Sequence, residues 1–341
     1  MTQAPLRLRL DGDALTANWR ALAAMSGRAA CGAAVKADGY GLGAREVVRR
    51  LADAGCRDFF VATWSEAAAL GDPGVAVSGL HGVRAEDMAA ARAGPARPVL
   101  NTAEQVLRWR ETGMPCDVMV DTGMNRLGVS VAEVADGLLD GLSIDTLMSH
   151  LACADEDVSM NVVQREALAG LAGRTSAKRL SLANSAGIGL GADYGFDLTR
   201  PGIALYGGVP GPAFCAIRQV VTPEAQILQR RRVRAGATIG YNATYTPPAD
   251  MEVAVLNIGY ADGYLRCFSG KGRAWADGVE LAVLGRVSMD LVAVGVDAAP
   301  DLREGNWVAL DYDLPRTAAL SGLSQYELLT GLGPRFDRLW D

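Results

Sequence analysis

The feature that most constrains the fold is an alternation, from residue 30 to about residue 207, of short apolar runs with longer helix-like stretches. The runs are rich in β-branched residues and the stretches in Ala, Leu, Arg and Glu, which indicates a strand–helix repeat. The expected strands are Cys31–Val35, Phe59–Ala62, Val75–Gly79, Arg97–Leu100, Asp117–Val120, Ile144–Met148, Arg179–Leu182 and Ile203–Tyr206, and the helices include Ala44–Ala54, Ser65–Leu70, Thr102–Thr112 and Val158–Ala172. Eight strands in roughly 180 residues predict a TIM-type (β/α)8 barrel.

A different pattern follows residue 217. Short runs separated by Gly, Asp and Pro indicate a second, mainly β domain, with strands expected at Val253–Ile258, Glu280–Leu284 and Leu291–Val296. We therefore expect a barrel over residues 11–217 and a C-terminal β-rich domain over residues 218–341, with the glycine-rich segment 207–212 near the boundary.

Composition excludes several classes of protein. The 33 basic and 39 acidic residues give a net charge of −6 without long runs of like charge, which argues against nucleic-acid binding. Six well-separated cysteines without a C-x-x-C pair and only two histidines argue against a metal cluster or a disulfide framework. The first residues lack the apolar core of a signal peptide, and no run of 18 apolar residues follows, so we expect a cytoplasmic protein without a membrane partner.

Polar residues follow several of the expected barrel strands. Active sites of such barrels gather at the carboxyl ends of the strands. The residues there are Lys36, Asp121, Arg126, His150, Asn184 and Ser185. Although any single polar loop residue is unremarkable, this convergence predicts an active site at that rim.

Lys36 lies in the segment Ala34-Val-Lys-Ala-Asp-Gly-Tyr-Gly-Leu-Gly43, where a lysine ends an apolar strand and glycines follow. A lysine leaving a desolvated strand end can have a lowered pKa and form a Schiff base. On this segment alone, a surface lysine beside a tight turn stays an open alternative.

Together with seven other blocks, this segment resembles the alanine racemase family over nearly the whole chain. The blocks occur in the order of the family and are Val120-Asp-Thr-Gly-Met-Asn-Arg-Leu-Gly128, Ser149-His-Leu-Ala-Cys-Ala-Asp155, Leu182-Ala-Asn-Ser-Ala186, Arg200-Pro-Gly-Ile-Ala-Leu-Tyr-Gly207, Ile239-Gly-Tyr-Asn-Ala-Thr-Tyr245, Ile258-Gly-Tyr-Ala-Asp-Gly263 and Gly285-Arg-Val-Ser-Met-Asp290.

The resemblance implies a barrel that carries pyridoxal 5′-phosphate, a C-terminal β domain that residues 1–10 join, and a homodimer with shared active sites. It implies that Lys36 holds the cofactor and is the base on one face of the substrate, and that Tyr241 of the other subunit is the base on the opposite face. Two bases are needed because racemisation removes a proton from one side of a planar carbanion and delivers one to the other.

Further roles follow from the same resemblance. Arg200 contacts the pyridine nitrogen, and because a guanidinium keeps its proton, the ring is a weaker electron sink, which favours racemisation over transamination. His150 is the neighbour of Tyr241 and connects it to Arg200. The phosphate contacts are Tyr40, Ser185 and the backbone of Gly202 and Ile203, and the substrate contacts are Arg126 and the Met289 N–H, with Tyr260 at the entrance.

Three positions depart from the family pattern. Met119 stands where many members have a carbamylated lysine that orients the substrate arginine, so another group or an anion has to hold Arg126. The stretch Leu328–Arg335 lacks a tyrosine that some members place over the phosphate, and Trp64 is bulkier than the aliphatic residue expected near the cofactor, although core packing explains it equally well.

The sequence therefore predicts an isomerase that interconverts L- and D-alanine, acts on a small-molecule amino acid, needs no metal and supplies D-alanine for the cell wall. A broader or serine-directed racemase is the nearest alternative, because one hydroxyl changes binding by only about 1–3 kcal/mol. A non-catalytic carrier of the cofactor would not need the second domain with Tyr241 and Met289. A metal-assisted aldolase or a decarboxylase is disfavoured by the scarcity of histidine and by Arg200.

Overall fold

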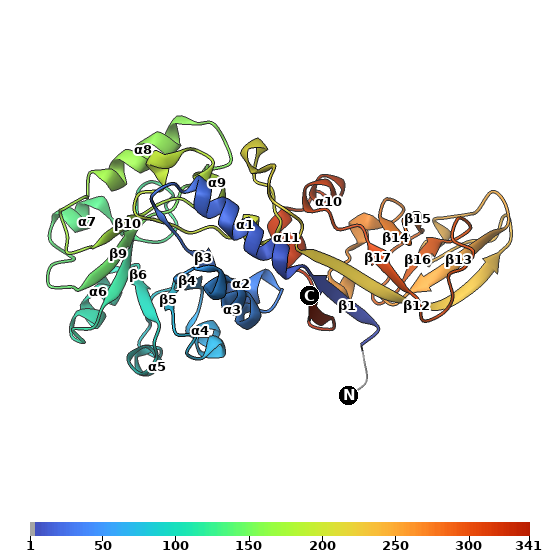
Figure 1. Ribbon diagram of the computed structural model, residues 1–341, viewed down its shortest axis with the longest axis horizontal. Helices are drawn as coiled ribbons and strands as arrows, with labels where there is room; N and C mark the ends of the chain where they lie inside the picture. Colours follow the sequence, from blue (N-terminus) through green and yellow to red (C-terminus); the bar gives the residue numbers. More distant parts are fainter. Residues whose placement is uncertain (1–3) are drawn as a thin grey trace. The chain divides into compact units, whose positions relative to one another are not determined.

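The computed structural model describes residues 4–341, which form two compact units. One unit spans Leu15–Arg218, and the other joins the residues up to Ala14 to Gln219–Asp341. Figure 1 shows helices wrapped around parallel strands in the first unit and an antiparallel sheet in the second.

The first unit is a barrel of parallel strands. Its wall follows the chain order β3, β4, β5, β6, β7, β9, β10, and every neighbouring pair is parallel. The strands are β2 (Ala30–Cys31), β3 (Ala33–Ala34), β4 (Asp58–Val61), β5 (Ala76–Gly79), β6 (Arg97–Leu100), β7 (Cys116–Asp121), β8 (Val129–Ser130), β9 (Ile144–Met148), β10 (Arg179–Ser181) and β11 (Leu198–Thr199). All four residues of β4 are buried, as expected for strands covered on both faces.

The barrel is closed by β11, which occupies the eighth position of the wall in the described chain. It pairs in parallel with β2. On its other side, the Arg200 N–H donates to the Ala183 carbonyl at 2.8 Å and the Asp197 N–H to the Leu180 carbonyl at 3.1 Å, next to β10. The predicted barrel is therefore confirmed, but the expected eighth strand at Ile203–Tyr206 is wrong.

Ile203–Tyr206 form a 3₁₀-helix, η2, between Gly202 and a left-handed Gly207. The run is fully buried, and a short buried apolar run has the same pattern in a strand and in a helix. Gly207 has a φ of 96°, which ends the helix in a conformation that favours glycine.

Helices cover the outside of the barrel. They are α1 (Gly12–Met25), α2 (Lys36–Tyr40), α3 (Ala44–Ala54), α4 (Trp64–Leu70), α5 (Met88–Ala93), α6 (Ala103–Arg110), α7 (Val131–Ala135), α8 (Ser159–Ala169) and α9 (Ser185–Ile188), with 3₁₀ turns η1 (Ala192–Tyr194) and η3 (Pro212–Phe214). Helix starts follow local signals: Thr63 and Ser130 each cap a helix and form a capping box with a glutamate three residues later. Within residues 4–341, no helix combines the length and apolarity needed to cross a membrane.

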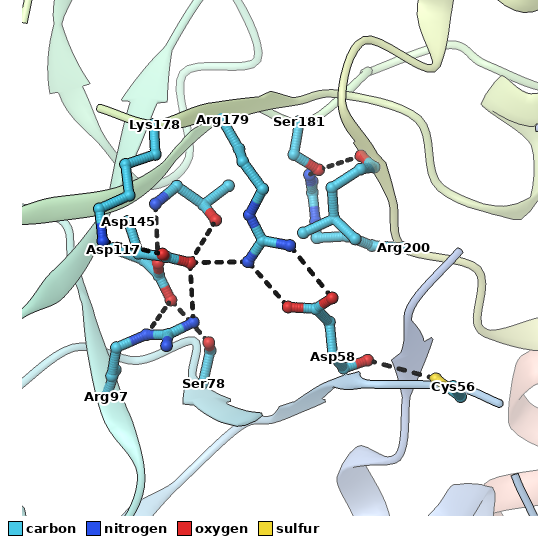
Figure 2. Close-up of polar contacts among 12 residues, drawn as sticks. Cys56, Asp58, Ser78, Arg97, Asp117, Asp145, Lys178, Arg179, Ser181 and Arg200 are labelled. Atoms are coloured by element: carbon cyan, nitrogen blue, oxygen red, sulfur yellow. Dashed lines mark hydrogen bonds and ion pairs between the residues drawn. The ribbon is translucent and has the colours of Figure 1, made fainter. Parts of the chain in front are cut away.

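Charged residues connect the strands inside the barrel (Figure 2). Arg179 of β10 binds Asp58 of β4 at 2.8 Å and Asp145 of β9 at 2.6 Å. Arg97 of β6 binds Asp145 at 3.1 Å. The buried Asp117 of β7 accepts a hydrogen bond from the Ser78 hydroxyl of β5 at 2.6 Å. This network links six strands, so it stabilises their relative positions.

The second unit is an eight-stranded sheet in the order β13-β16-β15-β14-β17-β12-β1-β18. Its strands are β1 (Leu6–Leu10), β12 (Val221–Val233), β13 (Met251–Leu256), β14 (Arg273–Ala276), β15 (Val279–Leu284), β16 (Val292–Gly295), β17 (Trp307–Leu310) and β18 (Asp337–Trp340). It also contains α10 (Leu314–Ser321), α11 (Gln325–Thr330) and the 3₁₀ turns η4 (Tyr241–Ala243), η5 (Tyr260–Asp262) and η6 (Arg266–Phe268).

The long strand β12 organises this sheet. A register shift between Ile227 and Gln229 divides it. The first part pairs with β1 and β17, and the second part pairs with β13, which closes six strands into a ring. Of residues 1–10, which we assigned to this domain, residues 1–3 lie outside the described part of the chain and Leu6–Leu10 form β1.

Candidate active site

Lys36 begins a turn of unusual backbone conformation directly after β3. Ala37, Asp38 and Gly39 have φ values of 52°, 53° and 63°, so α2 winds with a left hand. For a residue with a side chain, this conformation costs roughly 1–2 kcal/mol because Cβ comes too close to the following carbonyl oxygen. Strain of this kind persists where surrounding contacts impose it, and it clusters at functional sites. The backbone beside Lys36 is therefore a candidate functional feature in its own right.

Glu66 of α4 is one of the contacts that hold this turn. Its carboxylate accepts the Ala37 N–H at 2.9 Å and the Ala62 N–H, at the end of β4, at 2.6 Å. The same carboxylate completes the capping box with Thr63. Glu66 thus ties the residue after Lys36 to the neighbouring strand end.

The surroundings of Lys36 favour its neutral amine. Although the side chain keeps contact with solvent, partial desolvation at the rim and repulsion from Arg126 lower its pKa, and attraction by Glu66 offsets only part of this effect. An amine with a lowered pKa is a better nucleophile and base near neutral pH.

His150, which directly follows the residue after β9, is also kept neutral. Burial, together with the positive charges of Arg200, Arg126 and Lys36, lowers its pKa to about 3. The Gln164 side-chain amide donates to the His150 carbonyl at 2.9 Å and fixes the backbone there. These electrostatic couplings show that four residues expected at the rim, His150, Arg200, Arg126 and Lys36, lie near one another.

Arg200 is fully buried, and its guanidinium is held by protein oxygens. One terminal nitrogen donates to the Ser181 hydroxyl (Figure 2). The other donates to the Ser149 carbonyl at 2.5 Å. No acceptor for Nε is found among residues 4–341, which leaves this donor for a ligand. Burial lowers the pKa of Arg200 to about 10 and the Asp117 carboxylate opposes the shift, so the group stays charged at neutral pH.

Ser185, the first residue of α9, is arranged to donate a hydrogen bond through its hydroxyl. Its buried hydroxyl oxygen accepts the Gly202 N–H at 2.9 Å and the Ala204 N–H at 3.2 Å. A hydroxyl has two acceptor lone pairs and one donor hydrogen. Because both lone pairs are used, the remaining hydrogen suits an acceptor such as a phosphate oxygen. The Gly202 N–H is itself engaged with Ser185, so its contact with phosphate stays a prediction, as does that of Ile203, the first residue of η2.

Tyr40 lies against Gly202 on the same side of the site. A Cβ atom added to Gly202 would lie 2.2 Å from the Tyr40 hydroxyl. The other face of the Tyr40 ring stacks on Tyr206 with 4.6 Å between ring centroids, and the Tyr206 hydroxyl donates to the Ala34 carbonyl at 2.9 Å. Tyr40, Ser185 and Gly202 therefore form a hydroxyl-lined cradle that the absence of a side chain at residue 202 keeps open.

Arg126 lies on the exposed loop after β7, whose backbone is held by Asp121. The Asp121 carboxylate accepts the N–H groups of Gly123 at 2.8 Å, Asn125 at 3.1 Å and Arg126 at 3.1 Å. Partial burial alone would raise the pKa of Asp121, but these donors lower it. Within residues 4–341 no ion-pair partner of the Arg126 guanidinium is found, and Met119 is a buried residue of β7 in register with Met148 of β9.

The three remaining predicted residues lie in the second unit. Tyr241, in η4, is 64% exposed and Met289 is 53% exposed. Tyr260 starts η5, and the neighbouring Ala261 N–H donates to the Met289 carbonyl at 3.0 Å, so Tyr260 and Met289 lie on contacting loops. The barrel residues form one cluster, and these three belong to a separate unit.

Sequence reasoning missed the residues that support this cluster. Glu66 is the fourth residue of a Thr-x-x-Glu pattern, which could have marked the start of α4 but not its bond to Ala37. Ser149 and Ser181 hold Arg200 through a carbonyl and a hydroxyl, for which the sequence offers no signal. Trp64 packs against the core and donates its indole N–H to the Gly82 carbonyl at 2.8 Å.

A lysine with a lowered pKa, a charged guanidinium and a cradle of hydroxyl donors define the class of barrel site that binds a phosphorylated aldehyde cofactor through a lysine. The chain belongs to the alanine racemase family. The family model "Alanine racemase, N-terminal domain" matches residues 10–210, and the model "Alanine racemase, C-terminal domain" matches residues 220–340. The predicted family is confirmed.

Similar proteins agree over nearly the full length of the chain. The alanine racemase of Acidiphilium cryptum is 42% identical over 97% of this chain and 98% of its own. The catabolic alanine racemase of Agrobacterium fabrum is 40% identical over 97% of this chain and 91% of its own. The crystal structure of alanine racemase from Bartonella henselae with covalently bound pyridoxal phosphate has a TM-score of 0.90, with 33% identity over 98% of this chain and 99% of that one.

Proposed function

We propose that the protein is a pyridoxal-phosphate-dependent isomerase that interconverts L- and D-alanine, with Lys36 and Tyr241 of the partner subunit as its two bases. The observation that carries the proposal is the cluster at the barrel rim, where Lys36 of lowered pKa lies near Arg126, His150 and the buried Arg200. The names of the relatives support the same activity.

The residues present fit pyridoxal phosphate. The Ser185 hydroxyl has its lone pairs filled by two N–H groups, and the Tyr40 hydroxyl occupies the space that a side chain at residue 202 would take. These two hydroxyls would bind the phosphate, Lys36 would hold the cofactor, and Arg200 Nε would face its ring nitrogen. When bound, the cofactor supplies an electron-withdrawing ring that acidifies the α-proton of an amino acid.

The chain's own groups then handle the proton. On one face Lys36 accepts the proton as the amine and returns it as the ammonium, and on the other face Tyr241 accepts it as the phenolate and returns it as the phenol. His150 is neutral at working pH because its pKa is about 3, so it supports Tyr241 as a polar hydrogen-bonding partner and not as a cation. Arg200 keeps its proton at a pKa of about 10 and does not hand it to the ring nitrogen, which favours return of the proton to the α-carbon.

Substrate binding rests on charge. Arg126 has no protein counter-ion in the described chain, so a substrate carboxylate supplies one, and the Met289 N–H is the second donor. We assign Tyr260 to the entrance of the site as part of this proposal. Because Tyr241, Tyr260 and Met289 belong to the second unit and two of them are strongly exposed, we propose a homodimer in which each site is completed by the partner subunit. We also propose that the barrel domain spans residues 11–217 and that residues 1–10 join a C-terminal domain of residues 218–341. We further propose that the protein is cytoplasmic and that it supplies D-alanine for the cell wall.

The test is loss of optical activity together with exchange of the α-proton for deuterium, measured with L-alanine, D-alanine and L-serine. Racemisation fastest with alanine is expected, faster turnover of serine would favour the broader-specificity alternative, and no exchange with bound cofactor would refute the activity. Lys36→Ala should abolish the absorbance of the lysine-bound cofactor at about 420 nm.

Two tyrosine variants separate the two bases. Tyr241→Phe should slow proton exchange from L-alanine far more than from D-alanine, because one face loses its base and the other keeps Lys36. Tyr326→Phe, at another exposed tyrosine of the same unit, is the control and should leave both rates unchanged. Equal losses with both enantiomers in Tyr241→Phe would contradict the assignment of the two bases.

A further inference from the structure

Two loops of the second unit are in direct backbone contact. The Tyr260 N–H donates to the Ser288 carbonyl, and the Ala261 N–H donates to the Met289 carbonyl, both at 3.0 Å. A Cβ atom on Gly259 would lie 2.3 Å from the Met289 carbonyl oxygen, so a glycine is required there for the loops to meet. The position of the loop around Met289 is therefore set by the loop around Tyr260.

This contact also fixes the direction of the Met289 N–H. That N–H and the Ser288 carbonyl belong to one peptide, and no cis peptide bond occurs in the described residues. In a trans peptide the two groups point in opposite directions. Since the Ser288 carbonyl points to Tyr260, the Met289 N–H points away from that loop. The Ser288 N–H donates to the Leu291 carbonyl at 3.0 Å and closes the turn.

Arg335, which lies between α11 and β18, bridges the same two loops through its side chain. Its Nε donates to Asp262 Oδ1 at 2.6 Å, and its Nη1 donates to Asp290 Oδ1 at 2.8 Å. Asp262 is only 1% exposed and its other oxygen accepts the Gly259 N–H at 3.0 Å. A buried carboxylate requires such partners, so Asp262 holds Arg335 in place, and the other edge of the guanidinium reaches the half-exposed Asp290.

We propose that Arg335 is a positioning residue for substrate recognition, which holds the Ser288–Leu291 turn through Asp290 so that the Met289 N–H keeps its direction. This inference rests on the proposed function, which assigns that N–H to the substrate carboxylate. The outer pair between Arg335 and Asp290 is half exposed, and such pairs contribute little to global stability. The expected effect therefore falls on the placement of one hydrogen-bond donor, for which small displacements have large consequences in binding.

The test compares Arg335→Met with Arg335→Lys in the full-length enzyme loaded with pyridoxal phosphate. Arg335→Met should raise KM for alanine by roughly tenfold while kcat changes by less than about threefold, because ground-state binding of the carboxylate is weakened and the bases are untouched. Arg335→Lys should have a KM between those of Arg335→Met and the wild type, since an ammonium lacks the planar fork that reaches two carboxylates. Arg232→Met, which removes another exposed ion pair of this unit, with Asp250, is the matched control and should leave KM unchanged.

Asp290→Ala removes the acceptor in the outer half of the bridge, leaves the buried Asp262 paired with Arg335, and keeps the inference testable if Arg335→Met does not fold. It should raise KM in the same direction as Arg335→Met, and the double variant should not exceed Arg335→Met alone. Additive effects, or an unchanged KM in Asp290→Ala, would overturn the inference.

Hydrogen exchange of the backbone gives a readout that does not depend on activity. Amides of residues 286–292 should exchange faster in Asp290→Ala than in the wild type, and those of β12 should not change. Unchanged exchange at residues 286–292 would overturn the positioning role even in an active enzyme. If the wild type bound cofactor but racemised no amino acid, the proposed function would fail, and faster exchange in the variant would still establish that Asp290 holds the turn.

Discussion

Replacing Gly202 by alanine should damage the phosphate cradle in a defined way. The added Cβ would lie 2.2 Å from the Tyr40 hydroxyl, 2.9 Å from Tyr40 Cζ and 3.5 Å from Ala34 Cβ. The prediction rests on this close contact with Tyr40, whose hydroxyl is the nearest atom to the added Cβ.

The size of the effect follows from how little Tyr40 can move. Its ring is stacked on Tyr206 at 4.6 Å and its own backbone has a φ of 56°, so the hydroxyl cannot retreat without disturbing both. Overpacking of this kind costs about 1–3 kcal/mol. Loss of one hydrogen bond to the charged phosphate should add about a tenfold to hundredfold loss of cofactor affinity.

Urea unfolding of the cofactor-free protein and titration with pyridoxal phosphate at about 420 nm measure the two effects separately. Gly211→Ala is the matched control, because Gly211 has an extended φ of 174° and no atom within 4 Å of the added Cβ; its stability should stay within about 0.5 kcal/mol. In the double variant with Tyr40→Phe, part of the lost stability should return, because the closest contact disappears. If Gly202→Ala bound cofactor with wild-type affinity and stability, Tyr40 would not be confined as the structure indicates.

Three further predictions test the surroundings of the site. Arg179→Met should lower the free energy of unfolding by about 3–5 kcal/mol, measured by urea denaturation, because Asp58 is left buried without its partner, and a loss below about 1 kcal/mol would contradict the network. Ala37→Val should destabilise the protein and weaken cofactor binding while Ala37→Gly should not, because a φ of 52° suits glycine and excludes β-branched residues; equal thermal midpoints for the two would disprove strain there. Because His150 has a pKa of about 3 when folded and about 6.5 when unfolded, its protonation favours unfolding, so stability should fall as pH drops from about 6.5 towards 3 by up to about 1.4 kcal/mol per pH unit; an unchanged slope in His150→Gln would exclude this origin.

The barrel could be predicted because its strands are short, buried on both faces and separated by helices with clear periodicity. The helix Ala44–Ala54 was predicted with its observed bounds, since Gly43 and Gly55 flank it. The prediction of the eighth strand failed because the real strand is too short to give a pattern. Leu198–Thr199 is two residues long and gives no periodic signal, whereas the buried apolar run Ile203–Tyr206 resembles a strand in sequence and folds as a 3₁₀-helix.

In the candidate site, several side chains could be predicted from the sequence, but the backbone conformation could not. Residues with distinctive chemistry, such as Lys36, Arg126 and His150, could be found because they follow strands whose ends converge. The left-handed turn at Ala37 and Asp38 could not, because alanine disfavours that conformation, aspartate adopts it only as an isolated residue, and here tertiary contacts such as the Glu66 carboxylate impose it. Glycines at 39 and 41 indicated a turn there, but not its hand.

Because residue 119 is methionine, Arg126 has to be held differently from the substrate arginine of many family members. A lysine-derived carbamate is impossible at residue 119, and in the described chain no other acidic side chain contacts the Arg126 guanidinium. Asp121 fixes the loop backbone only, so no carboxylate of the described chain screens Arg126 from the nearby Lys36, whose pKa is lowered first by burial and then by repulsion from Arg126. The same unpaired charge that leaves Arg126 without a protein anchor in the described chain therefore helps to keep Lys36 unprotonated. In this chain, the departure from the family pattern at Met119 thus favours a reactive lysine.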